Sequence, residues 1–248
     1  MRARAARDNR WVMSRFATLA LGLGFIAACG GGEPLAKAPD KEAEDAPRRS
    51  HGQSLDVSGE VGALDEDKVT KTFMQSVKDL ESCLGKGAKR VEFLGGSVAF
   101  FVKIDQRGRV AHAHMEHSSL GDRETEKCML EALSNRGWPA PVGGLVGVAR
   151  KGFDFDPPND VRAPTDWPSE KASSALASKA SEIQKCKHSS AGSFQATLYV
   201  DTGGKVLAAG VAPPDEPGED AVDCLVAVLK DTKFPSPGSW PAKVTTEL

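Results

Sequence analysis

Apolar and polar positions follow one order twice along this chain. Residues 98–104 and 194–200 alternate between apolar and other side chains, and β-branched or aromatic residues are common there, which is typical of a half-buried strand. Apolar side chains three or four residues apart predict helices before and after each strand pair. The predicted order is helix, strand, strand, helix, strand, at residues 70–84, 98–104, 109–116, 122–135 and 145–155, then at 176–186, 194–200, 205–212, 218–231 and 241–248.

From residue 96 onward, copy 1 aligns with copy 2 without a gap when 96 is added, whereas the spacing between the first helix and the first strand is seven residues longer in copy 1. Matched positions include Gly96/Gly192, Asp105/Asp201, Gly108/Gly204, Cys128/Cys224, Pro139/Pro235 and Pro141/Pro237. One register held over so many positions indicates an internal duplication. We therefore expect an α+β fold made of a tandem α-β-β-α-β domain, with two helices packed on one face of a short, mainly antiparallel sheet. The expected boundaries are 61–156 for copy 1, 157–168 for a linker and 169–248 for a divergent copy 2.

Asp105 and Asp201 each stand three residues before a glycine, between two predicted strands. An aspartate there accepts hydrogen bonds from turn amides, and the glycine tolerates positive φ. We assign both carboxylates to turns and not to catalysis.

The N-terminus carries an export pattern. Residues 16–28 are an apolar stretch too short to span a bilayer as a mature helix, and they end in Ile-Ala-Ala before Cys29. This resembles the lipobox of bacterial lipoproteins, which implies a signal peptide at 1–28, lipidation of Cys29 and a membrane anchor there. In lipoproteins, aspartate directly after the lipidated cysteine is the usual signal for retention in the inner membrane. Gly30 stands at that position here, so the resemblance implies sorting to the outer membrane. An ordinary cleaved signal and an uncleaved anchor are the alternatives, and translation starts at Met1 or Met13.

Residues 29–60 are rich in Gly, Pro, Ala and charge and carry few large apolar side chains. Such a composition buries too little surface to offset the entropy of ordering. We interpret the segment as a flexible tether from the lipidated cysteine to the folded part.

The features that carry a resemblance to a known family are a strand ending in Ile-Asp, a Gly-x-Val turn, a cysteine on the second helix and Trp138-Pro-Ala-Pro. This pattern resembles TonB C-terminal domains, and more narrowly the myxobacterial AgmX-type gliding-motility C-terminal domain. Copy 1 matches well and copy 2 more weakly, because Pro213-Pro214-Asp215 replaces His117-Ser118-Ser119. The resemblance implies a periplasm-facing module that binds other proteins by adding a strand to a sheet edge. Energy coupling is not implied.

Four cysteines lie on the apolar faces of predicted helices: Cys83, Cys128, Cys186 and Cys224. Two helices on one sheet face would bring Cys83 to Cys128 and Cys186 to Cys224, and disulfides persist in exported proteins. We predict these two bridges. A zinc site, which lacks any CxxC spacing here, and free buried thiols are the alternatives.

His112 and His114 would project from one face of a strand, a spacing that can hold a metal ion, with Glu116 nearby. Copy 2 has Ala208 and Gly210 at the matched positions, so we interpret the histidines as exposed, outward side chains. A metal- or small-ligand-binding sensor that uses this face, with Phe101 and Lys103, is the alternative function.

The composition excludes some functions. Formal net charge is −2 and aromatic residues make up 6%, so neither a basic field nor a stacking surface indicates nucleic acid. No nucleophile elbow, P-loop, dinucleotide fingerprint or HExxH motif is present. We therefore expect no enzyme and no cofactor, and predict an outer-membrane lipoprotein that binds envelope proteins through strand edges or loops. An unrecognised hydrolase is a further alternative.

Overall fold

A computed structural model describes residues 4–5, 59–158, 160–187, 190 and 192–248. Within these residues the chain has a mixed α+β fold of five helices and two β-sheets. One sheet lies in the first half (residues 59–158, joined by the short β1) and the other in the second half (residues 160–248). Apart from Arg4 and Ala5, the predicted signal peptide lies outside the described residues, as do Cys29 and most of the predicted tether.

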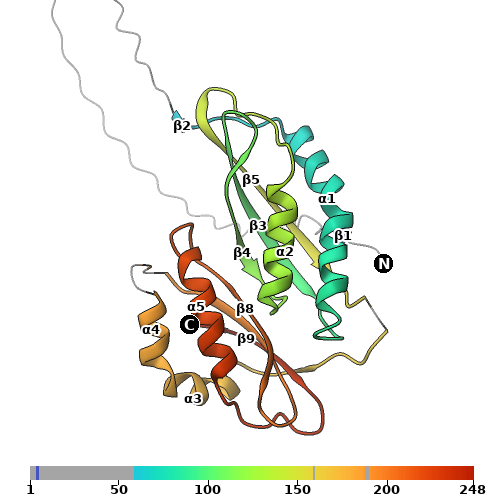
Figure 1. Cartoon of the computed structure of the whole chain (residues 1–248), viewed down its shortest axis with the longest axis vertical. Coiled ribbons are helices and arrows are strands. Elements are labelled where there is room, and N and C mark those ends of the chain that lie inside the picture. The colour runs from blue at the N-terminus through green and yellow to red at the C-terminus, as the bar shows by residue number, and fades with distance from the viewer. Residues whose placement is uncertain (1–3, 6–58, 159, 188–189, 191) are drawn as a thin grey trace, which may run out of the picture. The chain divides into compact units, whose positions relative to one another are not determined.

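The first sheet has the strand order β1-β5-β3-β4, with β2 parallel to β5 on the outer side. Its strands are β1 (Arg4–Ala5), β2 (Gly59–Val61), β3 (Gly96–Asp105), β4 (Val110–Ser118) and β5 (Gly144–Phe155). The central strand β3 is antiparallel to both neighbours. Helices α1 (Glu66–Gly87) and α2 (Arg123–Ser134) lie side by side across one face of this sheet (Figure 1).

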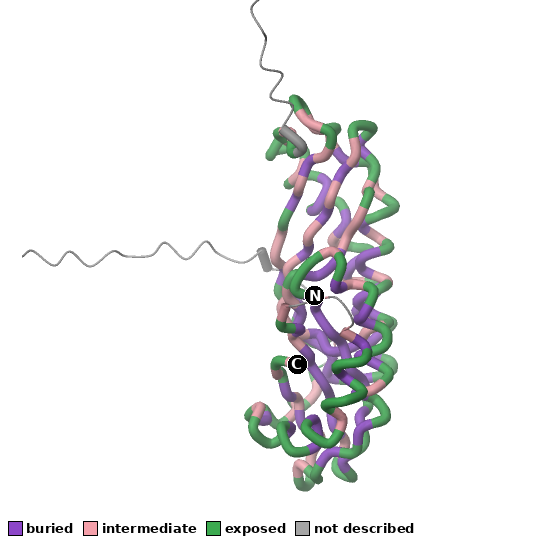
Figure 2. Tube along the Cα trace, turned by 90° about the vertical axis from the view of Figure 1, so that its left-hand side faces the viewer, coloured by how far each residue is buried: buried purple, intermediate pink, exposed green. Residues whose placement is uncertain are grey.

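Alternation along β3 places every second side chain under those helices. Phe100 and Ile104 are fully buried, and they share the core with Phe73 of α1 and Met129 of α2. Phe73 also packs edge-on against Trp138, which follows α2. Figure 2 shows buried positions alternating with more exposed ones along these strands, as period-two patterning requires.

The second sheet has the order β6-β9-β7-β8. Its elements are β6 (Thr165–Asp166), α3 (Glu170–Ser178), α4 (Ala180–Lys187), β7 (Gln195–Val200), β8 (Val206–Ala212), α5 (Glu219–Asp231) and β9 (Ala242–Glu247). Again the central strand is antiparallel to both long neighbours and a short strand runs parallel on the outer side.

Two details differ from the sequence prediction. The expected helix over 176–186 is broken at Lys179, because the hydroxyl of Ser178 donates to the carbonyl oxygen of Ala175 at 2.6 Å, the acceptor that the Lys179 amide would use in a continuous helix. That amide donates to Leu176 instead. The expected linker 157–168 also contains the short strand β6, which sheet pairing stabilises although its sequence shows no strand pattern.

The predicted turns are confirmed. The carboxylate of Asp105 accepts hydrogen bonds from the amides of Arg107 and Arg109 at 2.8 and 2.9 Å, and Gly108 has φ of 73°. Asp201 does the same for two amides of its own turn, where Gly204 has φ of 83°.

The two halves share a buried contact, which we call the seam. Tyr199 and Ala208, on the face of the second sheet that carries no helices, belong to the core of the first half. Thr197 on that face donates a 3.2 Å hydrogen bond to the carbonyl oxygen of Ser118. A side chain at Gly121, before α2, would collide with Thr197, so close approach requires a glycine there.

Candidate functional site

Among the described residues, the outer side of β5 is paired at its two ends. Gly144 and Val146 face β2, and Phe153 and Asp154 face β1. Between them, no strand in the described part of the chain pairs with residues 147–152 on the side away from β3. The stretch is therefore a sheet edge with backbone hydrogen-bonding groups available.

The direction of those groups follows from one hydrogen bond. The Gly62 amide donates to the carbonyl oxygen of Val146 at 2.7 Å, so the backbone polar groups of Val146 point away from β3. In a strand every second residue directs its N–H and C=O to the same side. Val148, Arg150 and Gly152 therefore present three donors and three acceptors to the outer edge.

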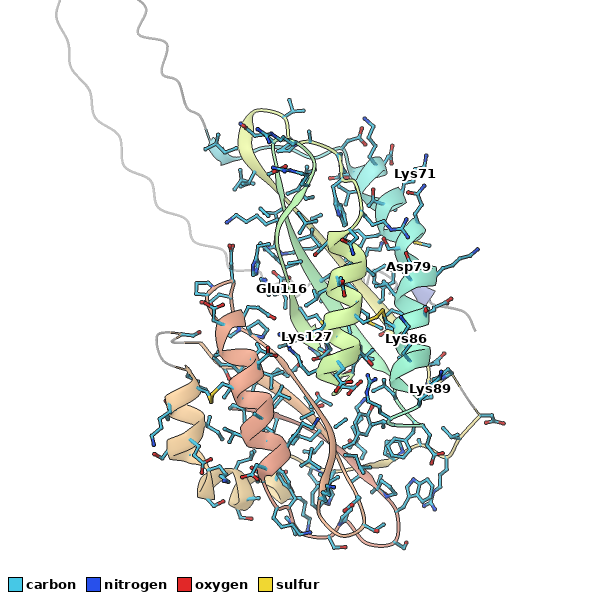
Figure 3. All side chains as sticks on the ribbon, viewed as in Figure 1. Lys71, Asp79, Lys86, Lys89, Glu116 and Lys127 are labelled. Atoms are coloured by element: carbon cyan, nitrogen blue, oxygen red, sulfur yellow. A yellow bond between two sulfur atoms is a disulfide. The ribbon has the colours of Figure 1, made fainter. Side chains whose placement is uncertain are left out.

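Such an edge is a template for an incoming extended segment, and charged side chains usually limit unwanted pairing there. Arg150 is exposed and Lys151 half-buried. Arg150 is held by neighbours: its guanidinium lies 4.8 Å from the centre of the Phe101 ring, and it donates to Glu116 at 2.8 Å. Figure 3 shows Glu116 on β4. The charge of Arg150 is thus partly matched before any partner arrives.

The helix-free face of the first sheet holds the histidines predicted as metal candidates. The ring of His114 stacks on Phe101 with 4.7 Å between centroids, and the Nε2 atom of His112 lies 3.1 Å from Nδ1 of His114. The structure therefore brings His112, His114 and Phe101 together. Lys103 pairs instead with Glu216 of the second half, with 3.0 Å between Nζ and Oε2.

The expectation that both histidines are exposed is wrong. His114 is 3% exposed and His112 is half-buried, because Phe101 covers one ring and the other lies beside the seam. Burial, and then the neighbouring His112, lower the pKa of His114 below its usual 6.5. His114 is therefore neutral at neutral pH, a state that can donate or accept within the pair.

A shallow hollow of about 600 Å³ opens beside His112. Its lining is polar and comes from both halves: Lys103, His112, Ala113, Glu216, Pro217, Glu219 and Asp220. Within the described residues, no group of three or more histidine, cysteine, aspartate or glutamate side chains is arranged to hold a metal ion. A metal in this place would rest on two protein nitrogens and water.

The four cysteines of the folded part form the predicted pairs. Cys83 is bonded to Cys128 and Cys186 to Cys224, with 5.7 and 5.5 Å between their Cα atoms. Figure 3 shows the first bridge in yellow between α1 and α2. The first bridge ties α1 to α2 and the second ties α4 to α5, and this agreement disfavours the zinc and free-thiol alternatives.

Comparison with known proteins gave no relatives. No protein-family model matches the chain, and neither the curated proteins nor the solved structures contain a match. The TonB-like resemblance therefore stays a prediction. None of the helices in the described residues is long and apolar enough to cross a bilayer.

Sequence reasoning did not identify the outward residues of β5 or a buried carboxyl in the seam, Glu126. The β5 edge has no local signature, since strand order depends on the whole chain. A signal for Glu126 was present: it lies beside the apolar stripe of its helix, and the matched position in the second half is Val222, which is fully buried.

Proposed function

We propose that this chain is a lipid-anchored protein of the bacterial envelope, built from two copies of one α-β-β-α-β domain, that binds another envelope protein and catalyses no reaction. The lipobox-like pattern before Cys29 supports the anchor and an outer-membrane, periplasm-facing location. The TonB-like motifs support the class of module.

Three structural features support the duplication. Both sheets have a central strand between antiparallel neighbours and a short parallel outer strand. Matched aspartates, Asp105 and Asp201, organise the first hairpin of each half. Matched cysteines, Cys128 and Cys224, lie in the last helix of each half and bond back to the preceding helix.

The observation that carries the binding proposal is the open outer edge of β5 at residues 147–152. It is long enough for an extended segment of about five residues, and three residues offer both a donor and an acceptor to it. Arg4 and Ala5, which pair with Asp154 and Phe153 on this edge, lie within the proposed signal peptide, so removal of that peptide extends the open edge to residue 154. The partner is accordingly an extended stretch of an envelope protein.

The test removes one outward donor and leaves the sheet intact. Val148→Pro deletes an N–H that points away from β3, and the preceding Gly147 tolerates the backbone restriction that proline imposes. Val148→Ala is the matched control, because it shortens the same side chain but keeps the amide. A photo-crosslinking amino acid at position 150 captures the partner in intact cells.

We expect the crosslinked adduct to form with Val148→Ala and to fall at least about tenfold with Val148→Pro, since one lost backbone hydrogen bond and the ring's bulk both oppose strand addition. Equal adducts from the two variants, with both disulfides formed, would refute edge binding. The anchor is tested separately: Cys29→Ser should abolish incorporation of labelled fatty acid and release the chain from the membrane fraction.

One observation favours a second candidate, a metal-binding sensor. Two nitrogens that each lie about 2.1 Å from one ion at a right angle are about 3 Å apart, and the ring nitrogens of His112 and His114 are 3.1 Å apart. The hollow leaves further coordination positions to water. Calorimetric titration with Cu²⁺ tests this: one equivalent should bind to the wild type and none to His112→Ala, whereas equal heats from both would exclude the pair as ligands.

A further inference from the structure

A carboxyl group lies buried in the seam between the two halves. Glu126, in the first turn of α2, is 1% exposed. The hydroxyl of Ser118 donates to its Oε1 atom at 2.6 Å, while its Oε2 atom is buried and has no hydrogen-bond partner among the described residues. An ionised carboxylate so placed carries a desolvation cost that exceeds the stabilisation from the Ser118 hydroxyl, the charge of Arg123 and the backbone of Gly121.

The backbone of β8, in the second half, lies directly against the Glu126 carboxyl with no side chain between them. A Cβ atom added at Gly210 of β8 would collide with both carboxylate oxygens of Glu126, so the backbone of β8 covers the group directly. Neither Ser118 nor Gly210 supplies a positive charge. If β8 moves away, water reaches both carboxylate oxygens.

The charged and titratable groups around Glu126 come from few elements. Arg123, on α2 itself, favours ionisation, but its guanidinium donates to Glu219 at 2.7 Å and to Asp223 at 2.8 Å on α5. Asp122, which begins α2, opposes ionisation. On β7, the hydroxyl of Tyr199 donates to the carbonyl oxygen of Gly95, and burial together with the charge of an ionised Glu126 raises the pKa of this hydroxyl.

We propose that Glu126 is a pH-responsive latch, which holds the second half against the first when protonated and loosens the seam when ionised. The matched residue Val222 is fully buried, so an apolar side chain satisfies the equivalent position and packing alone does not require a carboxyl at 126. A protonated carboxyl keeps the Ser118 contact at low cost. An ionised one favours the opened seam, where water solvates it.

The burial of Glu126 determines whether the open form gains or loses population as pH rises. Burial raises the pKa of Glu126 from 4.5 to about 7 in the closed form, and the Ser118 hydrogen bond lowers it only in part. The closed form therefore holds the proton over a range in which the open form has released it. The ratio of open to closed molecules should rise by up to about tenfold per pH unit between these two values and then level off.

The chain offers one probe at the right place, because Tyr199 is its single tyrosine and is fully buried at the seam. We would label the intact, disulfide-bonded chain with 3-fluorotyrosine and follow its fluorine NMR signal from mildly acidic to neutral pH. A second, solvent-exposed resonance should grow as pH rises in the wild type. Glu126→Gln should remove that growth, and Glu131→Gln, which changes an exposed carboxylate on the same helix, should keep it.

Glu126→Val supplies an independent variant, since it installs the residue of the matched position. It should show one buried resonance at every pH in this range. A pH-dependent second resonance of wild-type size in either Glu126 variant, or a single unchanging resonance in the wild type, would overturn the proposal.

Discussion

The hydroxyl of Tyr199 donates a 3.2 Å hydrogen bond to the carbonyl oxygen of Gly95, which joins β7 of the second half to the segment that precedes β3. The Nζ atom of Lys243, from β9, donates to the same oxygen at 2.7 Å and lies 5.4 Å from the centre of the Tyr199 ring. One backbone carbonyl of the first half thus anchors two strands of the second.

The ring of Tyr199 should matter more to stability than its hydroxyl. Tyr199→Phe removes one of two donors to Gly95 and should lower the free energy of unfolding by about 1 kcal/mol. Tyr199→Ala also removes the contact with Phe93, whose ring centre is 5.4 Å away, and should cost roughly 3–5 kcal/mol. Urea unfolding of the three proteins measures both differences, and equal losses in the two variants would contradict this ranking.

Lys243 should make the chain more stable in alkaline solution. Burial lowers its pKa in the fold from 10.5 to about 8, and Asp166 offsets this only in part. Between these values the unfolded chain holds more protons than the folded one, so the free energy of unfolding rises with pH across the window, by on the order of 3 kcal/mol in total. Below the folded-state pKa of about 8, both the folded and the unfolded chain hold the proton, so Lys243 gives no pH dependence of stability there.

Lys243→Met should lack this rise, because methionine does not titrate. Denaturant unfolding at both ends of the window gives the change for each protein, and Lys205→Met, on the turn before β8, is the control that should keep the wild-type slope. An identical slope in the wild type and in Lys243→Met would show that the ammonium is solvated in the fold.

Each disulfide should stabilise its own half. The bridged residues are 45 and 38 positions apart, and closing loops of that length is worth roughly 4 kcal/mol each on the chain-entropy model. Replacing Cys83 and Cys128 together by serine should lower the stability of the first half by about that amount. Hydrogen exchange, measured separately for β3 and β7 amides in the wild type and the double variant, tests this. The loss of protection should be larger in β3 than in β7. Equal losses would mean that the halves unfold as one unit.

Asp122 should be a more important helix cap than Asp65. Its carboxylate accepts from the Thr125 hydroxyl at 2.6 Å and from Arg90, and it is 5% exposed. Asp122→Ala leaves the guanidinium and hydroxyl without that acceptor and should cost roughly 2–3 kcal/mol. Asp65, which caps α1 through the Lys68 amide at 3.0 Å, is largely solvated, so Asp65→Ala should cost less in thermal unfolding.

Much of the secondary structure could be predicted from local patterns. Alternation over 98–104 and 194–200 predicted β3 and β7, because successive side chains of a strand point to opposite faces. In β3 one face is buried, whereas in β7 both faces are. The Asp105 and Asp201 turns followed from the spacing of aspartate and glycine. The cysteine pairs followed from their position on the apolar faces of neighbouring helices.

Tertiary structure alone decided the rest. The burial of His114, the open side of β5 and the covered carboxyl of Glu126 depend on segments far away in the sequence that pair with or cover them. Alternation tells which face a side chain takes, but not whether another part of the chain covers that face. The sequence by itself determined the main strands and helices and their crosslinks, whereas exposure, pairing edges and shifted pKa values arose from long-range contact, because desolvation depends on everything packed around a group.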